Sequence, residues 1–121
     1  MIRGTVVNIA SILGLVAASP LRNAAYCSSK GAVVNLTREL GVQWARRGIR
    51  VNAIAPGFFP SDMTTDMFAD RTTRGWLESN LPMRRVGREG ELDGALLFLA
   101  SSASSYMTGQ VVVVDGGWTA R

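Results

Sequence analysis

A strand, a long helix and a second strand follow one another in the first half of the chain, and this order constrains the fold most. Residues 5–10 are rich in β-branched side chains, which is typical of a strand buried on both faces in a parallel sheet. The helix is expected from Asn23, a plausible N-cap, to about Arg47, because Gly48 suits the position just after a helix. Residues 49–55 form the second strand. Such a unit joins parallel strands through a right-handed crossover, so the sequence predicts an α/β fold.

The second half of the chain adds a helix and a third strand. Residues 58–82 show no strong period and are expected to hold short helical pieces, either as a lid or substrate loop or as a plain surface excursion. Their apolar side chains mildly favour a substrate with an apolar part; they are Met63, Met67, Phe68, Trp76 and Leu77. A helix is expected to start at residues 88–91, with acidic residues in its first turn, and residues 111–114 to form a third buried strand. The prediction is three parallel strands flanked by helices.

Composition narrows the class of protein. At 121 residues, of which 47% are hydrophobic, the chain fits one globular domain with a real core. No apolar run approaches the ~18 residues of a membrane-spanning helix. The single cysteine excludes an internal disulfide and suits a reducing cytoplasm, and the lack of histidine removes His-dependent triads and most zinc and haem sites. The arginines are scattered or in small groups, so nucleic-acid binding is not expected despite a net charge of +4.

The long helix has apolar or small residues on two faces. A stripe at helical spacing consists of Val33, Leu36, Leu40 and Trp44. A helix with two apolar faces needs two partners, and the sheet is one of them. The same helix of a second subunit is the other candidate, because several small residues permit close helix–helix approach: Gly31, Ala32, Gly41 and Ala45. The sequence therefore predicts a homo-oligomer.

Tyr26 and Lys30 stand four residues apart near the start of this helix, which places both side chains on one face, one turn apart. A free phenol has a pKa of about 10, too high for efficient proton transfer near neutral pH, and a nearby cation lowers it by favouring the phenolate. Lys30 is the only lysine among 13 basic residues, so a compact ammonium group stands beside a phenol. The pair is a candidate general acid/base. The alternative is a core tyrosine with a solvent-exposed lysine, because this spacing often arises by chance.

Ser11 directly follows the first predicted strand. In open α/β sheets, ligands bind at the carboxyl ends of the strands, which makes Ser11 a candidate site residue. Its alternative role is that of an ordinary loop or turn serine.

Taken in order, four motifs resemble those of the short-chain dehydrogenase/reductase family: Ser11, Tyr26-x-x-x-Lys30, residues 50–57 (Arg-Val-Asn-Ala-Ile-Ala-Pro-Gly) and residues 114–117 (Val-Asp-Gly-Gly). The resemblance covers essentially the whole chain and is nearest to 3-oxoacyl-carrier-protein reductases and gluconate 5-dehydrogenase-like members. It implies the C-terminal half of a Rossmann-type doubly wound parallel sheet that binds NAD or NADP. The implied activity is reversible hydride transfer between this cofactor and a small carbonyl or alcohol substrate.

The resemblance also implies a role for each site residue. Tyr26 would be the catalytic acid/base and would also contact the cofactor. Lys30 would tune Tyr26 and hold the nicotinamide ribose, and Ser11 would hydrogen-bond the substrate oxygen. Further cofactor contacts would come from the segment after the second strand, at Pro56, Gly57, Phe59 and Ser61. The backbone of Phe59 would meet the nicotinamide carboxamide, and Ser61 would replace the usual threonine near the pyrophosphate.

Members of this family are about twice as long, because a Rossmann-type domain has two halves. The half that carries the Gly-rich phosphate loop has no counterpart here, so residues 1–121 are expected to be the C-terminal portion of a single NAD(P)-binding domain, inactive when isolated. The resemblance implies a cytoplasmic homodimer or homotetramer. A rival hypothesis from a different class is a chain kept only for subunit pairing or scaffolding, with an inert Tyr26.

Overall fold

The computed structural model describes residues 3–61 and 68–121. Within them, one sheet has three parallel strands in the order β1-β2-β3, namely β1 (Gly4–Ile9), β2 (Ile49–Pro56) and β3 (Val111–Val114). In the register, Val6 lies beside Val51 and Ala55 beside Val113. The predicted parallel arrangement of three strands is therefore confirmed.

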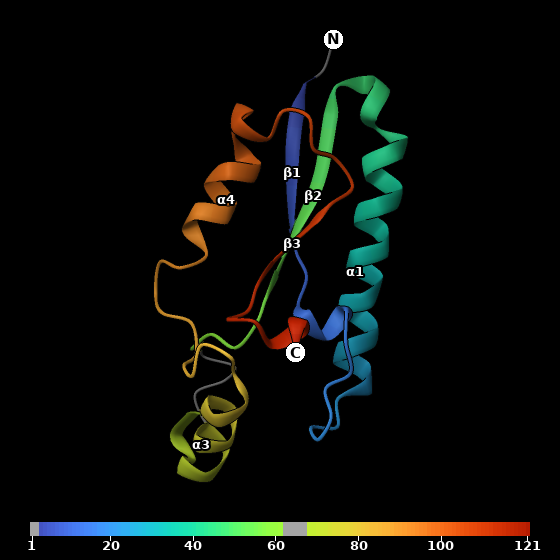
Figure 1. Ribbon diagram of the computed structural model, residues 1–121. Coiled ribbons are helices and arrows are strands. Elements are labelled where there is room, and N and C mark those ends of the chain that lie inside the picture. The colour runs from blue at the N-terminus through green and yellow to red at the C-terminus, as the bar shows by residue number, and fades with distance from the viewer. Residues whose placement is uncertain (1–2, 62–67) are drawn as a thin grey trace.

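The helices described in full are α1 (Ala24–Gln43), α3 (Arg71–Asn80) and α4 (Asp93–Ala100). α1 and α4 cover opposite faces of the sheet, whereas α3 lies beyond the carboxyl ends of the strands (Figure 1). Short 3₁₀ turns link these elements: η1 (Ile12–Gly14), η2 (Ala45–Arg47), η3 (Ser102–Ser104) and η4 (Trp118–Ala120). The strands therefore point their carboxyl ends at η1, α3 and η4.

The buried face of α1 differs from the apolar stripe predicted for it. Val34, Thr37 and Gly41 are the buried residues, whereas Leu36 is half exposed. The Thr37 hydroxyl donates to the Val33 carbonyl at 2.8 Å and accepts from Asn8 Nδ2 of β1 at 3.1 Å, so a polar residue fits against the sheet. A pattern built on apolar residues alone could not select this face.

Gly41 also has a different role from the one predicted. A Cβ atom at this position would lie 2.5 Å from the backbone nitrogen of Gly109, in the turn before β3. The close approach that Gly41 permits is therefore to the same chain, and not to a second subunit.

Only the middle strand is buried on both faces. Residues 51–55 of β2 are fully buried, whereas the outer strands β1 and β3 are only partly covered. The prediction of three buried strands is thus wrong for the two outer ones within the described residues. β2 is the central strand, so both of its edges are also paired, with β1 on one side and β3 on the other.

α4 begins later than the sequence predicts. Gly90 takes a left-handed conformation (φ 88°), and the Glu91 side chain accepts from the Arg88 backbone N–H at 2.7 Å. Residues 88–91 therefore form a turn, and the helix starts at Asp93. Glu91, which was expected in the first turn of the helix, stabilises this turn instead, and the acidic residue in the first turn of α4 is Asp93.

Side chains of β2 hold the loop between α4 and β3. The Arg50 guanidinium donates to backbone carbonyls of this loop, including Ser104 at 2.8 Å and Met107 at 3.2 Å. Asn52, which is fully buried, donates to the Met107 carbonyl at 3.1 Å and accepts from the Gln110 N–H at 3.0 Å. The Arg-x-Asn part of the motif thus fixes where β3 begins.

The main hydrophobic core lies beyond the carboxyl ends of the strands. Its buried members are Ile12, Leu77, Leu81 and Trp118. The Phe58 and Trp76 rings meet the Trp118 ring edge-on, with centroids 5.0 and 5.8 Å away. Three distant parts of the chain are therefore packed together at this end of the sheet.

This packing changes the meaning of the apolar residues in the segment 58–82. Leu77 is part of the core, and Phe68 and Trp76 pack around it. Met63 and Met67 lie outside the described residues. The apolar side chains of the described part of this segment therefore serve the hydrophobic core, and they no longer favour a substrate with an apolar part.

Candidate active site

Ser11 lies one residue beyond Ala10, at the carboxyl end of β1, and is buried. It caps η1: its Oγ accepts from the Leu13 backbone N–H at 3.1 Å. A serine hydroxyl keeps one O–H donor when it accepts such a bond. Ser11 is therefore a turn serine, as in its alternative role, whose proton can still be donated to a ligand oxygen.

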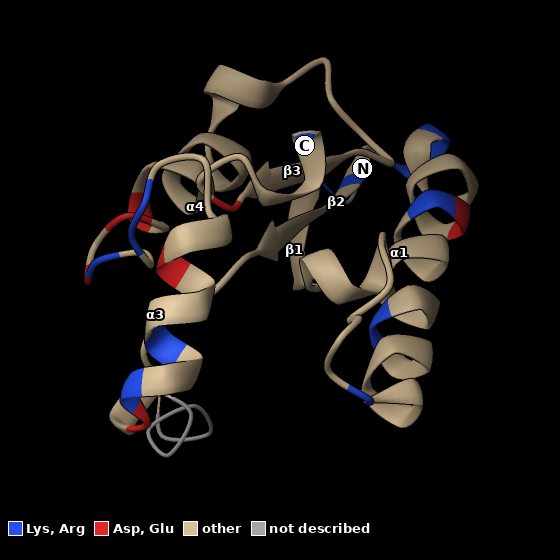
Figure 2. Ribbon diagram, turned by 60° about the horizontal axis from the view of Figure 1, so that its bottom comes forward, with Lys and Arg blue, Asp and Glu red and all other residues tan. Residues whose placement is uncertain are grey.

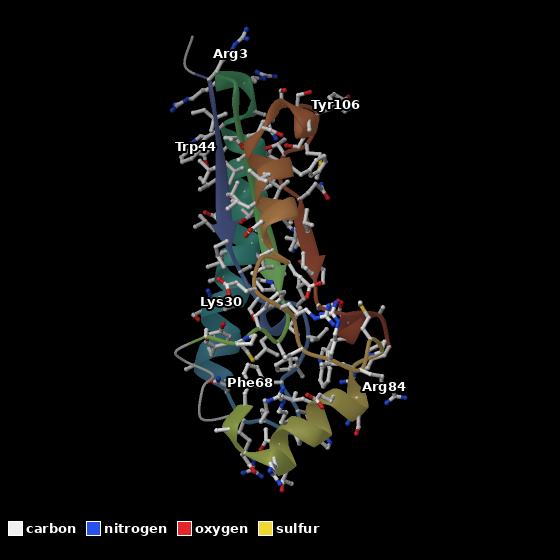
Figure 3. The ribbon with its side chains drawn as sticks, turned by 90° about the vertical axis from the view of Figure 1, so that its left-hand side faces the viewer. Arg3, Lys30, Trp44, Phe68, Arg84 and Tyr106 are labelled. Carbon is white, nitrogen blue, oxygen red and sulfur yellow. The ribbon has the colours of Figure 1, made fainter. Side chains whose placement is uncertain are left out.

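Tyr26 and Lys30 lie in the first two turns of α1, and both are half-buried. Lys30 Nζ donates to the carbonyl of Ile9, the last residue of β1, at 3.1 Å, and lies 5.8 Å from the centroid of the Tyr26 ring. Figure 3 shows Lys30 toward the end of the molecule that also carries Phe68, away from Trp44. The alternative of a core tyrosine and a lysine free in solvent therefore does not describe this structure.

Close packing of η1 against α1 sets the position of these residues. A Cβ atom on Gly14 would lie 2.6 Å from the Lys30 backbone oxygen and 2.9 Å from the Gly31 nitrogen. Only glycine allows this contact. Because η1 carries Ser11 at its N-cap and α1 carries Tyr26 and Lys30, the contact brings the Ser11 and Lys30 backbones to one end of the sheet.

The segment after β2 turns tightly against the segment after β3. The Gly57 N–H donates to the Val114 carbonyl at 2.9 Å, and a Cβ atom on Gly57 would lie 2.8 Å from the Asp115 Cα. Pro56 is the last residue of β2. Glycine at position 57 is thus required by a close backbone approach, and the next residues leave the sheet at its carboxyl edge.

The other two predicted cofactor contacts, Phe59 and Ser61, lie shortly after Gly57 in the chain. Phe59 is half-buried and packs against Gly87, and Ser61, the last described residue before the gap, is exposed. The structure therefore places all seven predicted site residues at or just beyond the carboxyl ends of β1 and β2, or on the start of α1.

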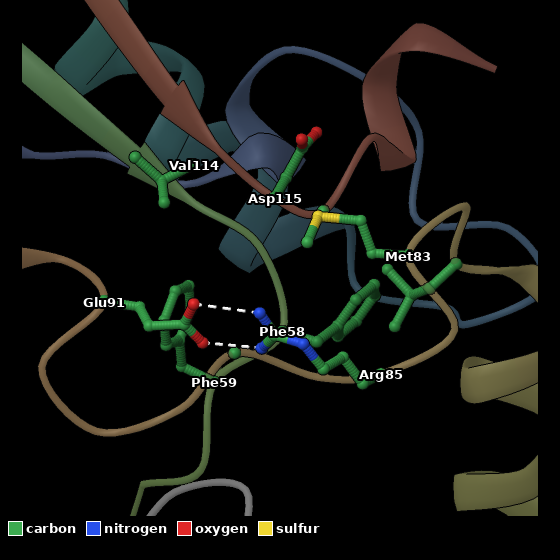
Figure 4. A pocket seen from close by; sticks show the side chains of 10 residues that line it. Phe58, Phe59, Met83, Arg85, Glu91, Val114 and Asp115 are labelled. Atoms are coloured by element: carbon green, nitrogen blue, oxygen red, sulfur yellow. Dashed lines mark hydrogen bonds and ion pairs between the residues drawn. The ribbon is translucent and has the colours of Figure 1, made fainter.

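A pocket of about 100 Å³ lies beside this segment (Figure 4). Phe58 and Phe59 line it together with Met83, Arg85, Glu91 and Asp115. The Arg85 guanidinium binds the Glu91 carboxylate through two contacts, Nη1 to Oε1 at 2.6 Å and Nη2 to Oε2 at 2.9 Å. No local sequence pattern indicates this pair, because its members are six residues apart in a turn.

The bonds from Arg85, followed by the Arg88 backbone N–H, hold the pKa of Glu91 at about 2. Asp115 also has a lowered pKa: partial burial would raise it, but hydrogen bonds from Thr119 and Gly117 outweigh that effect. Both carboxylates are therefore ionised across the neutral range.

Basic side chains are distributed over α1, α3 and the loop before α4, with acidic side chains among them (Figure 2). No helix within residues 3–61 and 68–121 combines the length and the apolar character needed to cross a membrane.

Known proteins match the chain along nearly its whole length. Residues 2–119 match the family described as enoyl-(acyl carrier protein) reductase. Galactitol 2-dehydrogenase (L-tagatose-forming) of Cereibacter sphaeroides is 45% identical over 117 residues, which cover 96% of this chain and 46% of that protein.

Solved structures match equally well. Gluconate 5-dehydrogenase of Burkholderia cenocepacia J2315, in complex with NADP and tartrate, is 39% identical with a TM-score of 0.93, and the match covers 98% of this chain and 46% of that one. 4-Hydroxyisoleucine dehydrogenase, complexed with NADH, is 34% identical with a TM-score of 0.93, covering 99% of this chain and 49% of that one.

The parallel strands, the flanking helices and these neighbours define the chain as part of a Rossmann-type sheet, the architecture of dinucleotide-binding oxidoreductases. The chain belongs to the short-chain dehydrogenase/reductase family. It spans about half the length of the curated relatives that it matches.

Proposed function

We propose that the chain is part of an NAD(P)-dependent oxidoreductase that interconverts a carbonyl and an alcohol. The observation that carries this proposal is the position of Lys30: its ammonium group is held on the Ile9 carbonyl at the carboxyl end of β1, 5.8 Å from the centroid of the Tyr26 ring. Ligands of open α/β sheets bind at this edge.

Each of the three polar residues has a distinct task in this proposal. Tyr26 transfers the proton to or from the substrate oxygen, and Lys30 keeps its ammonium group beside the Tyr26 ring. Ser11 donates its free O–H to the same substrate oxygen, on which negative charge develops during the reaction. A nicotinamide cofactor, when bound, would accept the hydride from the alcohol or supply it to the carbonyl.

The donor set also fits the cofactor. One of the three N–H donors of Lys30 is used on Ile9, which leaves two for ribose hydroxyls. We assign the nicotinamide end of the cofactor to the segment that leaves β2, with contacts from Pro56, Gly57, Phe59 and Ser61. The relatives bind NADP in one case and NADH in another, so the proposal covers both cofactors.

The substrate class follows from the relatives and is proposed on that basis. Galactitol and gluconate are the substrates named for two of them, and tartrate is bound in one solved structure. All three are small and polyhydroxylated. We therefore propose a polyol or a sugar acid as the alcohol, and the corresponding keto compound as the carbonyl.

We also propose that residues 1–121 act within a longer, homo-oligomeric protein of the cytoplasm, because relatives of twice the length match over this region and the single cysteine suits a reducing compartment. The outward face of α1 supports the oligomer: Val42 is 77% exposed and Leu36 is 50% exposed. Light scattering of the full-length protein should show a dimer or tetramer at micromolar concentration. A monomer alone would refute this part of the proposal.

The test of the main proposal is hydride transfer by the full-length protein. NAD⁺ or NADP⁺ should be reduced in the presence of one or more of a panel of polyols and sugar acids, and the isolated 121 residues should be inactive. The rival candidate is a scaffold that only pairs subunits. A full-length protein that assembles but transfers hydride with neither cofactor would favour that rival.

A further inference from the structure

We propose that Arg85 and Glu91 are positioning residues for the cofactor: they fix the turn 85–91, and this turn holds Phe58 and Phe59 where the nicotinamide end of the cofactor binds. The inference rests on the proposed function and extends it to two residues outside the Ser11, Tyr26 and Lys30 set.

Three hydrogen bonds to the Glu91 carboxylate close the turn. Arg85 binds both oxygens of Glu91, at 2.6 and 2.9 Å, and the Arg88 backbone N–H adds a third bond to Oε1 at 2.7 Å. Arg85 also donates to the Val86 carbonyl at 3.2 Å. Bidentate pairing of a guanidinium with a carboxylate fixes orientation as well as distance. The pair therefore sets the shape of the turn.

Gly87, at the middle of the turn, touches the cofactor segment directly. Its backbone N–H donates to the Phe58 carbonyl at 2.9 Å. A Cβ atom on Gly87 would overlap the ring of Phe59. The backbone of Phe58 and the side chain of Phe59 are thus both held by the same glycine, whose own position depends on Arg85 and Glu91.

A second ion pair of the chain shows what an ordinary surface pair looks like. Arg74 and Glu78 are four residues apart within α3 and joined by one contact at 3.0 Å. Their side chains are 55% and 38% exposed, against 30% and 39% for Arg85 and Glu91, so the two glutamates are equally exposed and the pairs differ in geometry. They join two turns of a helix that is already formed. Arg85 and Glu91 instead join two parts of a loop and line the pocket beside Phe59 (Figure 4).

This geometry predicts an effect at one end of the cofactor only. Residues 85–91 contact the segment assigned to the nicotinamide, whereas the adenosine end of a dinucleotide binds in the other half of a Rossmann-type domain. A loosened turn should therefore weaken binding of NAD(P)H and slow hydride transfer, but leave the binding of ADP, which lacks nicotinamide, unchanged.

The experiment compares Glu91→Gln with the matched control Glu78→Gln in the full-length protein. We expect Glu91→Gln to lower kcat by about tenfold or more, within the ~10²-fold that a misplacement of about 1 Å can cost. The Kd for NADH or NADPH, measured by nicotinamide fluorescence, should rise severalfold, while the calorimetric Kd for ADP should stay at the wild-type value. Glu78→Gln should match the wild type in all three.

Two further variants guard against a trivial loss of folding. Gly87→Ala keeps the ion pair but displaces the Phe59 ring, and should reproduce the kinetic effect of Glu91→Gln; its control is Gly94→Ala, where a Cβ atom meets nothing within 4 Å. The exchange Arg85→Glu/Glu91→Arg should recover part of the kcat that Glu91→Gln loses.

Several outcomes would overturn the inference. Wild-type kcat and NAD(P)H affinity in both Glu91→Gln and Gly87→Ala would do so while leaving the proposed function intact. Equal weakening of ADP and NAD(P)H binding would show a general structural role instead. If the wild type bound cofactor but transferred no hydride, the proposed function would fail, and the binding measurements would still decide the inference. A wild type that bound neither NADH nor NADPH would overturn both.

Discussion

Lys30 shows how a single residue can connect the sheet to the chemistry. Its ammonium group donates a hydrogen bond to the carbonyl of Ile9, the last residue of β1, which is a neutral acceptor. The positive charge is therefore not neutralised by that bond and remains available to Tyr26 and to ribose hydroxyls. Tyr26 and Lys30 lie one helical turn apart on α1, as the spacing in the sequence predicted.

The first prediction concerns Lys30→Arg in the full-length protein. The change keeps the charge, but a broad planar guanidinium cannot present the same compact set of donors beside Ile9 and the phenol. We expect turnover to fall by something like ~10²–10⁴-fold, the range of general acid–base catalysis, and the pH–rate profile to shift. A profile superimposable on that of the wild type would refute the role assigned to Lys30.

At the scale of elements, the motif at residues 50–57 was recognised by resemblance, but its physical basis appears only in three dimensions. Arg50 and Asn52 point their polar groups at the loop before β3, 50 or more residues away in the chain. Such contacts leave no local pattern in the sequence. The Asn and Arg side chains hold the fold together, whereas the end of the same motif, at Pro56 and Gly57, leads to the candidate site.

The second prediction is that Asn52→Ala destabilises the full-length protein by roughly 1–3 kcal/mol. The substitution leaves the Gln110 N–H without its partner and removes one of the two bonds to the Met107 carbonyl, the other coming from Arg50. A polar group left unpaired in the protein interior costs about this much. Urea denaturation measures the change. The control is Asn23→Ala, which should cost less than about 0.5 kcal/mol, because the N-cap Asn23 makes no side-chain capping bond. Equal losses for the two variants would contradict the account.

Helix boundaries and faces show why part of the fold could not be read from the sequence. The end of the helical region was predicted well, because Gly48 does take the left-handed conformation (φ 76°) that the position requires. The pattern did not predict the buried face of α1, because Thr37 meets the sheet through a hydrogen bond and Gly41 packs closely against the turn before β3. The start of α4 was missed because Glu91 bonds backwards to Arg88.

The candidate site also has residues that the sequence could predict and residues that it could not. Ser11, Tyr26 and Lys30 could be proposed from spacing and from their place after a strand, because both signals are local. Arg85 and Glu91 could not, since an ion pair that spans six residues in a turn has no periodic signature. Resemblance to a family supplied the assignments of the cofactor contacts, which geometry alone does not define.

At the scale of the whole molecule, the third prediction concerns stability in acid. Glu91 has a folded-state pKa of about 2, below its ordinary value of 4.5, so its contribution is fully present above pH 4.5 and is lost as the pH falls toward 2. The difference in unfolding free energy between the wild type and Glu91→Gln should therefore shrink across this window. A difference that stays constant from pH 6 to pH 2 would contradict the role of the Arg85–Glu91 pair.

The most direct test of the central claim is hydride transfer by the full-length protein with and without the Tyr26 hydroxyl. The wild type should reduce NAD⁺ or NADP⁺ with a polyol or sugar acid. Tyr26→Phe should lose ~10²–10⁴-fold of that turnover, because proton transfer fails, while its Kd for NAD(P)H stays within a few-fold of the wild type. Turnover by Tyr26→Phe equal to that of the wild type would contradict the claim that Tyr26 is the acid/base of this site.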